Sequence, residues 1–201
     1  MTVCGPRQKA AFSIIELLIV IALIVTAYVM LFSFASESHQ RTQKELCSDN
    51  LQKSFLALQI YANDYGYFPK DTNAQTSEQV LNLLVPKYTV DTSIFICPGG
   101  RDQAIPSGDP LDKYKISYAY YMGRDTNSAP GDFLMSDRQI NTLSKNIGDQ
   151  VFSYTGKAPG NNHHKFGGNF LFCDGSVQDF PSNATISLAF SNGIVLLNPK
   201  P

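Results

Sequence analysis

The sequence predicts an α+β protein, in which one long N-terminal helix precedes a small head built on an antiparallel sheet. Three observations support this prediction. Residues 12–35 form an apolar run, residues 36–65 have helical periodicity, and the C-terminal part of the chain alternates apolar and polar residues around an Asp-Gly pair. The 201 residues suffice for one ordinary domain beside such a helix and are too few for two large domains.

The first expected element is an apolar helix over residues 12–35. Residues 17–35 contain 19 positions without a charge, and Glu16 is the one charged residue of the whole run. At about 1.5 Å per residue, a helix over residues 12–35 is roughly 36 Å long, which exceeds a hydrocarbon core of about 30 Å. A cleavable secretory signal has a shorter apolar region, and a buried core helix carries a polar stripe that residues 17–27 lack. The run therefore predicts a membrane helix.

The flanking charges predict the orientation of this helix. Residues 1–11 carry Arg7 and Lys9 and no acidic residue, so this end stays in the cytoplasm by the positive-inside rule. The sequence of residues 36–201 contains no second run of membrane-spanning length. We therefore expect a single-pass protein of the cytoplasmic (inner) membrane with its N-terminus inside and residues 36–201 as a periplasmic or extracytoplasmic head.

The helix is expected to continue as an amphipathic segment as far as Tyr65. Apolar residues recur in this segment at intervals of three and four, which places them on one helical face, while Lys44 and other polar residues fall mostly elsewhere. The apolar face consists of Cys47, Leu51, Phe55, Leu58, Ala62 and Tyr65. Gly66 and Pro69 provide the stop signals. We expect this face to pack on the core of the head.

Shorter elements follow the long helix. Thr76 and Gln79 have the spacing of a capping box and predict a short helix over residues 77–85. Residues 113–122, KYKISYAYYM, alternate from Tyr114 onward and predict a strand, and residues 133–135 predict another.

A C-terminal hairpin is expected over residues 168–180, GNFLFCDGSVQDF. Apolar residues alternate around the Asp-Gly pair at positions 174–175, a dipeptide favoured in two-residue type I′ turns because both central residues need positive φ. In that register one face of the hairpin carries Phe170, Phe172 and Val177. Residues 186–197 are expected to add one strand or helix.

Glu16 points to a specific family. A carboxylate in a membrane helix is costly unless it reaches the interface, where the helix dipole favours it, or meets a positive partner. The run KAAFSIIELLIVIALI, residues 9–24, resembles the leader of type IV prepilins and type II secretion pseudopilins. In that family a short basic leader ends at a small residue, and a Phe, a Glu and a long apolar helix follow at fixed spacing.

The resemblance implies a leader over residues 1–11, a membrane helix over residues 12–35 and a pilin-like head beyond. It implies that prepilin peptidase cleaves between Ala11 and Phe12 and that the new Phe12 amine is N-methylated, although the family normally has Gly where this chain has Ala11. Glu16 would then pair with the N-terminal amine of an adjacent subunit and set the register between subunits.

Two further segments extend the resemblance. Residues 47–71, CSDNLQKSFLALQIYANDYGYFPKD, resemble the segment that follows the membrane helix in major pseudopilins. Residues 163–177, HHKFGGNFLFCDGSV, resemble the ending of a large group of pilin-like proteins. The residues that match this ending, for which either a structural or a ligand-binding role stays open, are His164, Gly167, Gly168, Asn169, Asp174 and Gly175.

The chain offers one cluster of residues that could support metal binding or catalysis. It consists of Asp137, His163, His164, Cys173 and Asp174. Their spacing matches no standard zinc pattern, and the hydrolase, phosphate-loop and metalloprotease motifs are all missing from the sequence. A Cys between apolar strand residues is more often packed than nucleophilic. We therefore expect no cofactor, no metal and no enzymatic activity.

The mature chain would keep three cysteines, because Cys4 leaves with the leader. A disulfide between Cys47 and Cys97 would join the long helix to the head and close a loop of about 50 residues, which stabilises a fold by roughly 2–4 kcal/mol. With Cys173 as the third candidate, the pairing stays open.

These features predict a structural subunit of a type IV pilus or a type II secretion pseudopilus. Its partners would be prepilin peptidase, other pilin or pseudopilin subunits, the cytoplasmic membrane and the assembly platform. A net charge of −1 gives no reason to expect nucleic acid. The alternative is a membrane-anchored module that does not polymerise and that binds a ligand through the 164–174 region or the Tyr-rich residues 114–121.

Overall fold

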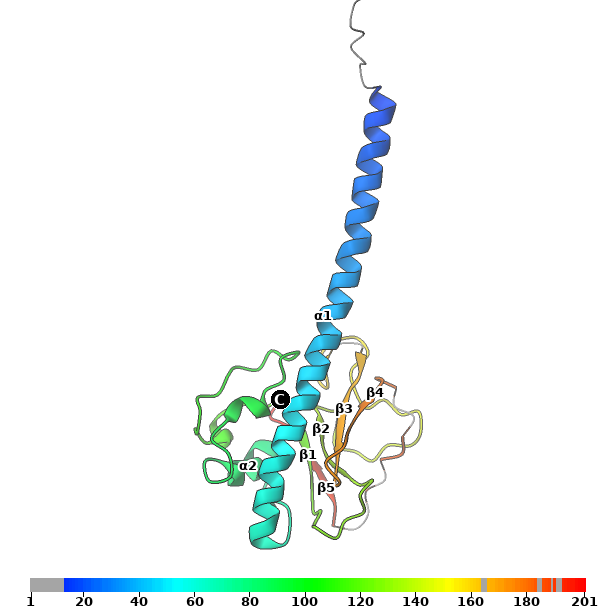
Figure 1. Ribbon diagram of the computed structural model, residues 1–201. Helices are drawn as coiled ribbons and strands as arrows, with labels where there is room; N and C mark the ends of the chain where they lie inside the picture. Colours follow the sequence, from blue (N-terminus) through cyan, green and yellow to red (C-terminus); the bar gives the residue numbers. More distant parts are fainter. Residues whose placement is uncertain (1–12, 164–165, 184–185, 189, 191–192) are drawn as a thin grey trace, which may run out of the picture. The chain divides into compact units, whose positions relative to one another are not determined.

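The computed structural model describes residues 13–163, 166–183, 186–188, 190 and 193–201. Within them the chain is α+β, with an apolar N-terminal helix and a five-stranded antiparallel sheet (Figure 1). The helices are α1 (Ile14–Tyr65) and α2 (Ser77–Leu81), with 3₁₀ turns at Asn82–Leu84, Thr92–Phe95 and Leu111–Lys113. The strands are β1 (Tyr118–Met122), β2 (Phe133–Asp137), β3 (Gly168–Phe172), β4 (Val177–Phe180) and β5 (Val195–Leu197).

The chain divides into two compact units, Met1–His39 and Gln40–Pro201, and α1 contributes to both. In the first unit, the stretch Ile14–Phe32 is long and apolar enough to cross a membrane. Every side chain in this stretch is exposed. An apolar surface of this extent needs cover from lipid or from other helices.

In the second unit, α1 packs on the core through the face that its periodicity predicts. Cys47, Leu51 and Leu58 on this face are fully buried. The helix ends at Tyr65 as expected, where Gly66 takes a φ of +80° and its N–H donates to the carbonyl of Ala62.

Two residues of this segment differ from the expectation. Tyr65, the last residue of α1, is 49% exposed, whereas Tyr61 one turn earlier is 7% exposed. Lys44, expected on the polar side, is only 7% exposed. It lies three residues before Cys47 and therefore on the same helical face.

The sheet has the strand order β4-β3-β2-β1-β5, and every adjacent pair is antiparallel. Two apolar clusters cover its two faces. Tyr118 and Tyr120 of β1 belong to the cluster that contains the buried face of α1, and Tyr121 belongs to the other. Because both faces are covered, β1 is buried on both sides.

The strand predicted over residues 113–122 is shorter in the structure. Only Tyr118–Met122 is a strand, and Leu111–Lys113 forms a 3₁₀ turn. Ile116 is buried as its pattern suggests, but its N–H donates to Oε1 of Glu78 at 3.2 Å. The Glu78 carboxylate thus accepts the backbone hydrogen bond that the carbonyl of a neighbouring strand would otherwise accept.

The hairpin lies where the sequence places it, but its turn differs. The prediction of a two-residue type I′ turn is wrong. Leu171 pairs with Val177, so the loop holds three residues, Cys173–Gly175. Gly175 has a φ of +85°, as in the three-residue hairpin loop that ends in a left-handed glycine. The added loop residue shifts the register, so Val177 lies on the face of Leu171 and opposite to that of Phe170.

The remaining elements follow the prediction with changed bounds. The helix expected over residues 77–85 is α2 followed by a 3₁₀ turn, and Oε1 of Gln79 accepts the N–H of Thr76 at 3.3 Å. The strand predicted at residues 133–135 extends to Asp137 as β2. The element expected within residues 186–197 is the strand β5.

Replacement of Gly175 by Ala should lower the free energy of unfolding of the head by about 1–3 kcal/mol, because its φ disfavours a side chain. An added Cβ would also lie 2.5 Å from Cε1 of Phe55. Urea unfolding of the full chain in detergent, followed by near-ultraviolet circular dichroism, measures the change.

Gly131→Ala is the matched control, since an added Cβ there meets no atom within 4 Å. We expect its unfolding midpoint to stay close to that of the wild type. Equal midpoints for the two variants would contradict the assigned turn.

Candidate functional site

The candidate site is a buried polar cluster centred on Asp137, the last residue of β2. The Asp137 side chain is fully buried and accepts four hydrogen bonds. Its Oδ2 accepts the backbone N–H of Asn169 at 2.7 Å and the Nδ2 of the same residue at 3.2 Å. Its Oδ1 accepts from Nδ2 of Asn162 at 2.8 Å.

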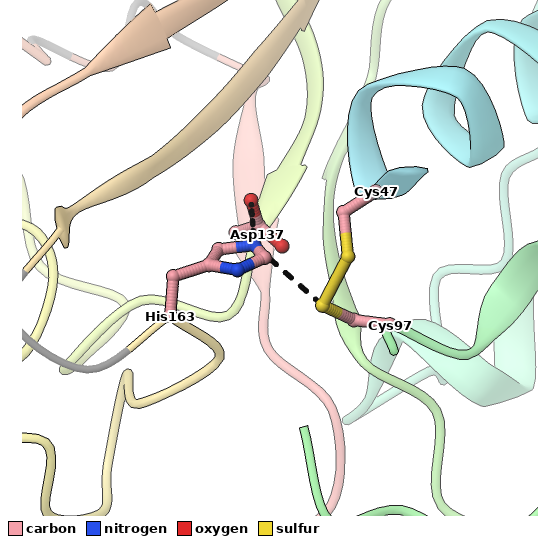
Figure 2. Close-up of side chains that lie close together, drawn as sticks. All are labelled: Cys47, Cys97, Asp137 and His163. Carbon is pink, nitrogen blue, oxygen red and sulfur yellow. Dashed lines mark hydrogen bonds and ion pairs between the residues drawn. A yellow bond between two sulfur atoms is a disulfide. The ribbon is translucent and has the colours of Figure 1, made fainter. Parts of the chain in front are cut away.

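His163 connects this carboxylate to a disulfide. Its Nε2 lies 3.1 Å from Oδ2 of Asp137 and 3.5 Å from Sγ of Cys97 (Figure 2). Cys97 is bonded to Cys47, which lies on the buried face of α1. Asp137, His163 and the disulfide therefore form one contiguous group from distant parts of the chain.

Burial and hydrogen bonding act against each other on Asp137. Burial raises the pKa of its carboxyl, but the interaction with His163 and the N–H groups of Asn162 and Asn169 lower it more. The pKa of Asp137 therefore lies below its usual value, and the group stays ionised at neutral pH.

The Gly-Gly-Asn segment at residues 167–169 shapes the space around this carboxylate. An added Cβ on Gly168 would lie 2.9 Å from Cβ of Asp137, and Gly167 has a φ of +79°. Asn169 also donates from Nδ2 to the carbonyl of Lys44 at 2.9 Å. Gly168 and Asn169 thus position Asp137, and Asn169 also joins it to α1.

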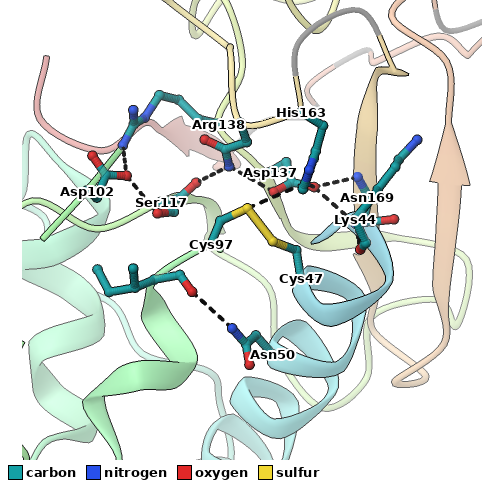
Figure 3. Close-up of a disulfide and its surroundings, with 12 residues drawn as sticks. Lys44, Cys47, Asn50, Cys97, Asp102, Ser117, Asp137, Arg138, His163 and Asn169 are labelled. Carbon is teal, nitrogen blue, oxygen red and sulfur yellow. Dashed lines mark hydrogen bonds and ion pairs between the residues drawn. A yellow bond between two sulfur atoms is a disulfide. The ribbon is translucent and has the colours of Figure 1, made fainter. Parts of the chain in front are cut away.

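A second, partly buried ion pair, between Arg138 and Asp102, lies near this cluster (Figure 3). Nη2 of Arg138 lies 2.8 Å from Oδ2 of Asp102 and also donates to the carbonyl of Ile116 at 2.6 Å. The hydroxyl of Ser117 donates to the same Asp102 oxygen at 2.7 Å. The carbonyl of Ser117 accepts from Asn162 at 2.7 Å, which links the two ion pairs.

Lys44 joins α1 to β4 of the C-terminal hairpin. Its ammonium group donates to the Asp179 carboxylate and to the carbonyl of Phe166, the latter at 2.6 Å. The Lys44 side chain is 9% exposed, whereas that of Asp179 is 70% exposed. These contacts satisfy the buried ammonium group of Lys44, a residue that its spacing predicts on the polar face of α1.

A basic pocket of about 740 Å³ opens beside the Asp102–Arg138 pair. Its walls include Arg101, Lys113, Lys115 and Lys157, none of which makes an ion pair within the described residues. Arg138 lines the pocket and also belongs to the buried cluster. The pocket therefore combines a fixed ion pair with a surplus of positive charge.

The metal candidates named from the sequence do not form one group. Asp137 and His163 meet, but Cys173 and Asp174 lie in the hairpin loop, where Asp174 accepts the N–H of Ser176 at 2.8 Å. Burial raises the pKa of the Cys173 thiol to about 12, so little nucleophilic thiolate is present at neutral pH. His164 lies outside the described residues. Asn162 and Cys97, which contact Asp137 and His163 respectively, were not predicted in this cluster, because both are distant in the chain from Asp137.

The other predicted site residues lie apart from this cluster. Glu16 is exposed in the first turn of α1, and Ala11 and Phe12 lie outside the described residues. Tyr118, Tyr120 and Tyr121, expected in the alternative hypothesis to meet a ligand, are at most 1% exposed. Tyr114 and Lys115 of the same segment are half-buried and line the basic pocket.

No protein-family model, curated protein or solved structure matches this chain significantly. The interpretation of the site therefore depends on its own chemistry. Its central carboxylate is buried, ionised and hydrogen-bonded by groups of β3 and of the segment at residues 162–163. Such a group organises the backbone segments that supply its donors.

Replacement of Asp137 by Asn should destabilise the head by about 3–5 kcal/mol. The variant removes a buried charge whose partners stay in place, and its amide group faces donors that need an acceptor. Urea unfolding of the full chain in detergent measures the loss.

Asp49→Asn makes the same chemical change at an exposed position of α1 and serves as the control. We expect it to alter the free energy of unfolding by less than about 0.5 kcal/mol. A similar, small loss in both variants would show that the Asp137 cluster contributes little to stability.

Proposed function

We propose that this protein is a structural, non-enzymatic subunit of a type IV pilus or a type II secretion pseudopilus. The observation that carries the proposal is Glu16, the one charged residue within an apolar helical run of membrane-spanning length. The basic leader and the Phe12 position at fixed spacing before Glu16 add to it.

The proposed mechanism is physical. The chain is held in the cytoplasmic membrane by residues 12–35, with its N-terminus inside and its head on the other side. Prepilin peptidase cleaves after Ala11, and the freed, N-methylated amine of Phe12 lies within the apolar helix. Glu16 of one subunit then neutralises the amine of another, which sets the register as the helices pack into a filament.

The exposed surface of the helix supports the assembly step. Within Ile14–Phe32 the large apolar side chains are all exposed, with Ile14 at 80% and Val20 at 43%. In the membrane this surface contacts lipid, and in a filament the helices of other subunits would replace the lipid. Glu16 is exposed in the first turn of the same helix and can therefore be reached by a neighbouring chain.

The contacts of α1 within Gln40–Pro201 support a structural role. The Cys47–Cys97 disulfide and the contacts of Lys44 both join the C-terminal half of α1 to the rest of Gln40–Pro201. A subunit pulled through its helix would transmit the force into the sheet through these links.

The basic pocket favours a second candidate function, a membrane-anchored module that binds a small multivalent anion. A volume of about 740 Å³ suits a small ligand. Arginine and lysine bind phosphate and carboxylate groups by charge-assisted hydrogen bonds. This function involves the head alone and does not need Glu16.

Replacement of Glu16 by Gln should leave membrane insertion and leader removal intact and abolish incorporation into filaments. The amide keeps the size of the side chain but cannot neutralise an amine. Mass spectrometry of the membrane-extracted protein reports the N-terminus, and the fraction of subunits in sheared filaments reports assembly.

The wild-type chain provides the reference, with a mature N-terminus at N-methylated Phe12. Glu45→Gln, on an exposed position of α1 within the second unit, is the matched control and should assemble normally. An intact Met1 in the wild-type protein would overturn the proposed processing, and normal assembly of the Glu16 variant would remove Glu16 from the mechanism.

Pyrophosphate should bind the full chain in detergent at one site, and Lys115→Gln should weaken the binding by roughly 10-fold through the loss of a charge-assisted hydrogen bond. Isothermal titration calorimetry at low and high salt measures both. Lys53→Gln, at an exposed position of α1, is the control and should bind as the wild type does. Absence of saturable binding, or equal weakening in both variants, would argue against the anion site.

A further inference from the structure

Four buried side chains with metal-binding atoms converge at the centre of the head. They are Cys47, Cys97, Asp137 and His163, and their ligand atoms all lie within 4.8 Å of one another (Figure 2). None of the four is more than 1% exposed. Two thiolates, an imidazole and a carboxylate form a donor set that zinc accepts in tetrahedral sites.

We propose that the reduced form of this chain binds one zinc ion through Cys47, Cys97, His163 and Asp137. Formation of the Cys47–Cys97 disulfide removes both sulfur ligands and releases the ion. The same four side chains thus give two alternative cross-links of the head, a metal centre in the reduced chain and a disulfide in the oxidised chain.

The distances in the oxidised chain already approach those of a zinc site. Bond lengths of about 2.3 Å to sulfur and 2.0 Å to nitrogen or oxygen place a sulfur and a nitrogen ligand about 3.5 Å apart, and a nitrogen and an oxygen ligand about 3.3 Å apart. Cys97 Sγ and His163 Nε2 are 3.5 Å apart, and His163 Nε2 and Asp137 Oδ2 are 3.1 Å apart. Two edges of the tetrahedron therefore need almost no adjustment.

The remaining adjustment concerns the two sulfur atoms. In a tetrahedral site they lie about 3.8 Å apart, so they must separate once the covalent bond between them is broken. Rotation about the side-chain bonds of Cys47 and Cys97 can provide this movement. Their backbone positions are held by α1 and by the segment after the 3₁₀ turn Thr92–Phe95.

The charges also balance. A zinc ion carries two positive charges, and the two thiolates carry two negative charges. Binding therefore leaves the single negative charge of Asp137, which the Asn162 and Asn169 N–H groups already satisfy. Zinc thus adds no net charge to a buried site, where an unpaired charge would be costly.

The surroundings hold the carboxylate ligand in place. Oδ1 of Asp137 accepts from Asn162 and Oδ2 from the backbone of Asn169, so the side chain is oriented before any ion arrives. Hydrogen bonds of this kind to a ligand usually change metal affinity by 10–100-fold. Asn162 is therefore a positioning residue for the proposed ion.

The redox step consumes a thiol reductant. Two reductant thiols are oxidised to one disulfide, while the Cys47–Cys97 bond takes up two electrons and two protons and becomes two thiols. Zinc binding then releases both protons as the thiols become thiolates. In the reverse direction, a disulfide oxidant takes up two electrons from the zinc-bound thiolates and two protons and becomes two thiols, while the Cys47–Cys97 disulfide forms and the ion is released.

Zinc binding would also affect the third cysteine, Cys173. In the reduced chain, zinc would hold Cys47 and Cys97 together and keep them from pairing with Cys173. Cys173 lies in the hairpin loop and is not one of the four ligands. The metal centre would therefore guide the chain to the disulfide that the structure contains.

Cobalt(II) provides the direct test, because it occupies tetrahedral zinc sites and gives an absorption band when thiolates bind it. The full chain in detergent is reduced with a thiol, freed of reductant without oxygen and titrated with cobalt. We expect one cobalt per chain with a thiolate band, which equimolar zinc removes. The oxidised chain should give no band. A reduced, folded chain without the band, or equal binding by the oxidised chain, would overturn the proposal.

Variants then test the ligand assignment. The double variant Cys47→Ser, Cys97→Ser should lose the thiolate band, whereas Cys173→Ser should keep it with unchanged affinity. Asn162→Ala should bind zinc roughly 10–100-fold more weakly in competition with a chelator, because it releases the Asp137 carboxylate. Loss of the band in Cys173→Ser, or unchanged affinity in Asn162→Ala with a native circular dichroism spectrum, would contradict the site.

Discussion

The buried carboxylate of Asp137 is the constraint on which the rest of the head depends. An ionised group without water must be met by donors, and an unmatched one would cost several kcal/mol. Its donors come from β3 and from the segment at residues 162–163. Once they converge on one acceptor, the end of β2, the start of β3 and the approach of Cys97 to His163 are fixed together.

The same cluster determines how the long helix is held. Asn169 binds Asp137 and also the carbonyl of Lys44, while Lys44 in turn reaches the hairpin. The Cys47–Cys97 disulfide closes the arrangement one turn further along α1. The helix therefore has two regions with different requirements. The region within Gln40–Pro201 is held by polar contacts and packing. The stretch Ile14–Phe32 presents an apolar surface that lipid or other helices must cover.

Local patterns predicted much of the fold, and the failures have physical causes. The period of α1 and its end at Tyr65 follow from the spacing of apolar residues and from Gly66. The Asp-Gly pair located the hairpin but not its loop length, because such a pair fits both a two-residue and a three-residue loop. The site was less predictable. The sequence analysis named Asp137 and His163. Cys97 and Asn162 meet them through tertiary contacts, and Lys44 joins the cluster only through Asn169, so local spacing could not predict these three.

Asp137 and Glu16 are both acidic residues in apolar surroundings, and they differ in how their charge is compensated. Asp137 receives its hydrogen bonds within the head, and its burial is thereby tolerated. Glu16 sits among apolar side chains, and the described residues provide it with no ion pair. A carboxylate in a run of membrane-spanning length is costly unless it reaches the interface or meets a counter-charge, and the described residues supply no counter-charge. A positive amine on an adjacent helix would meet this requirement, and burial among packed helices would then couple the charge pair to their register.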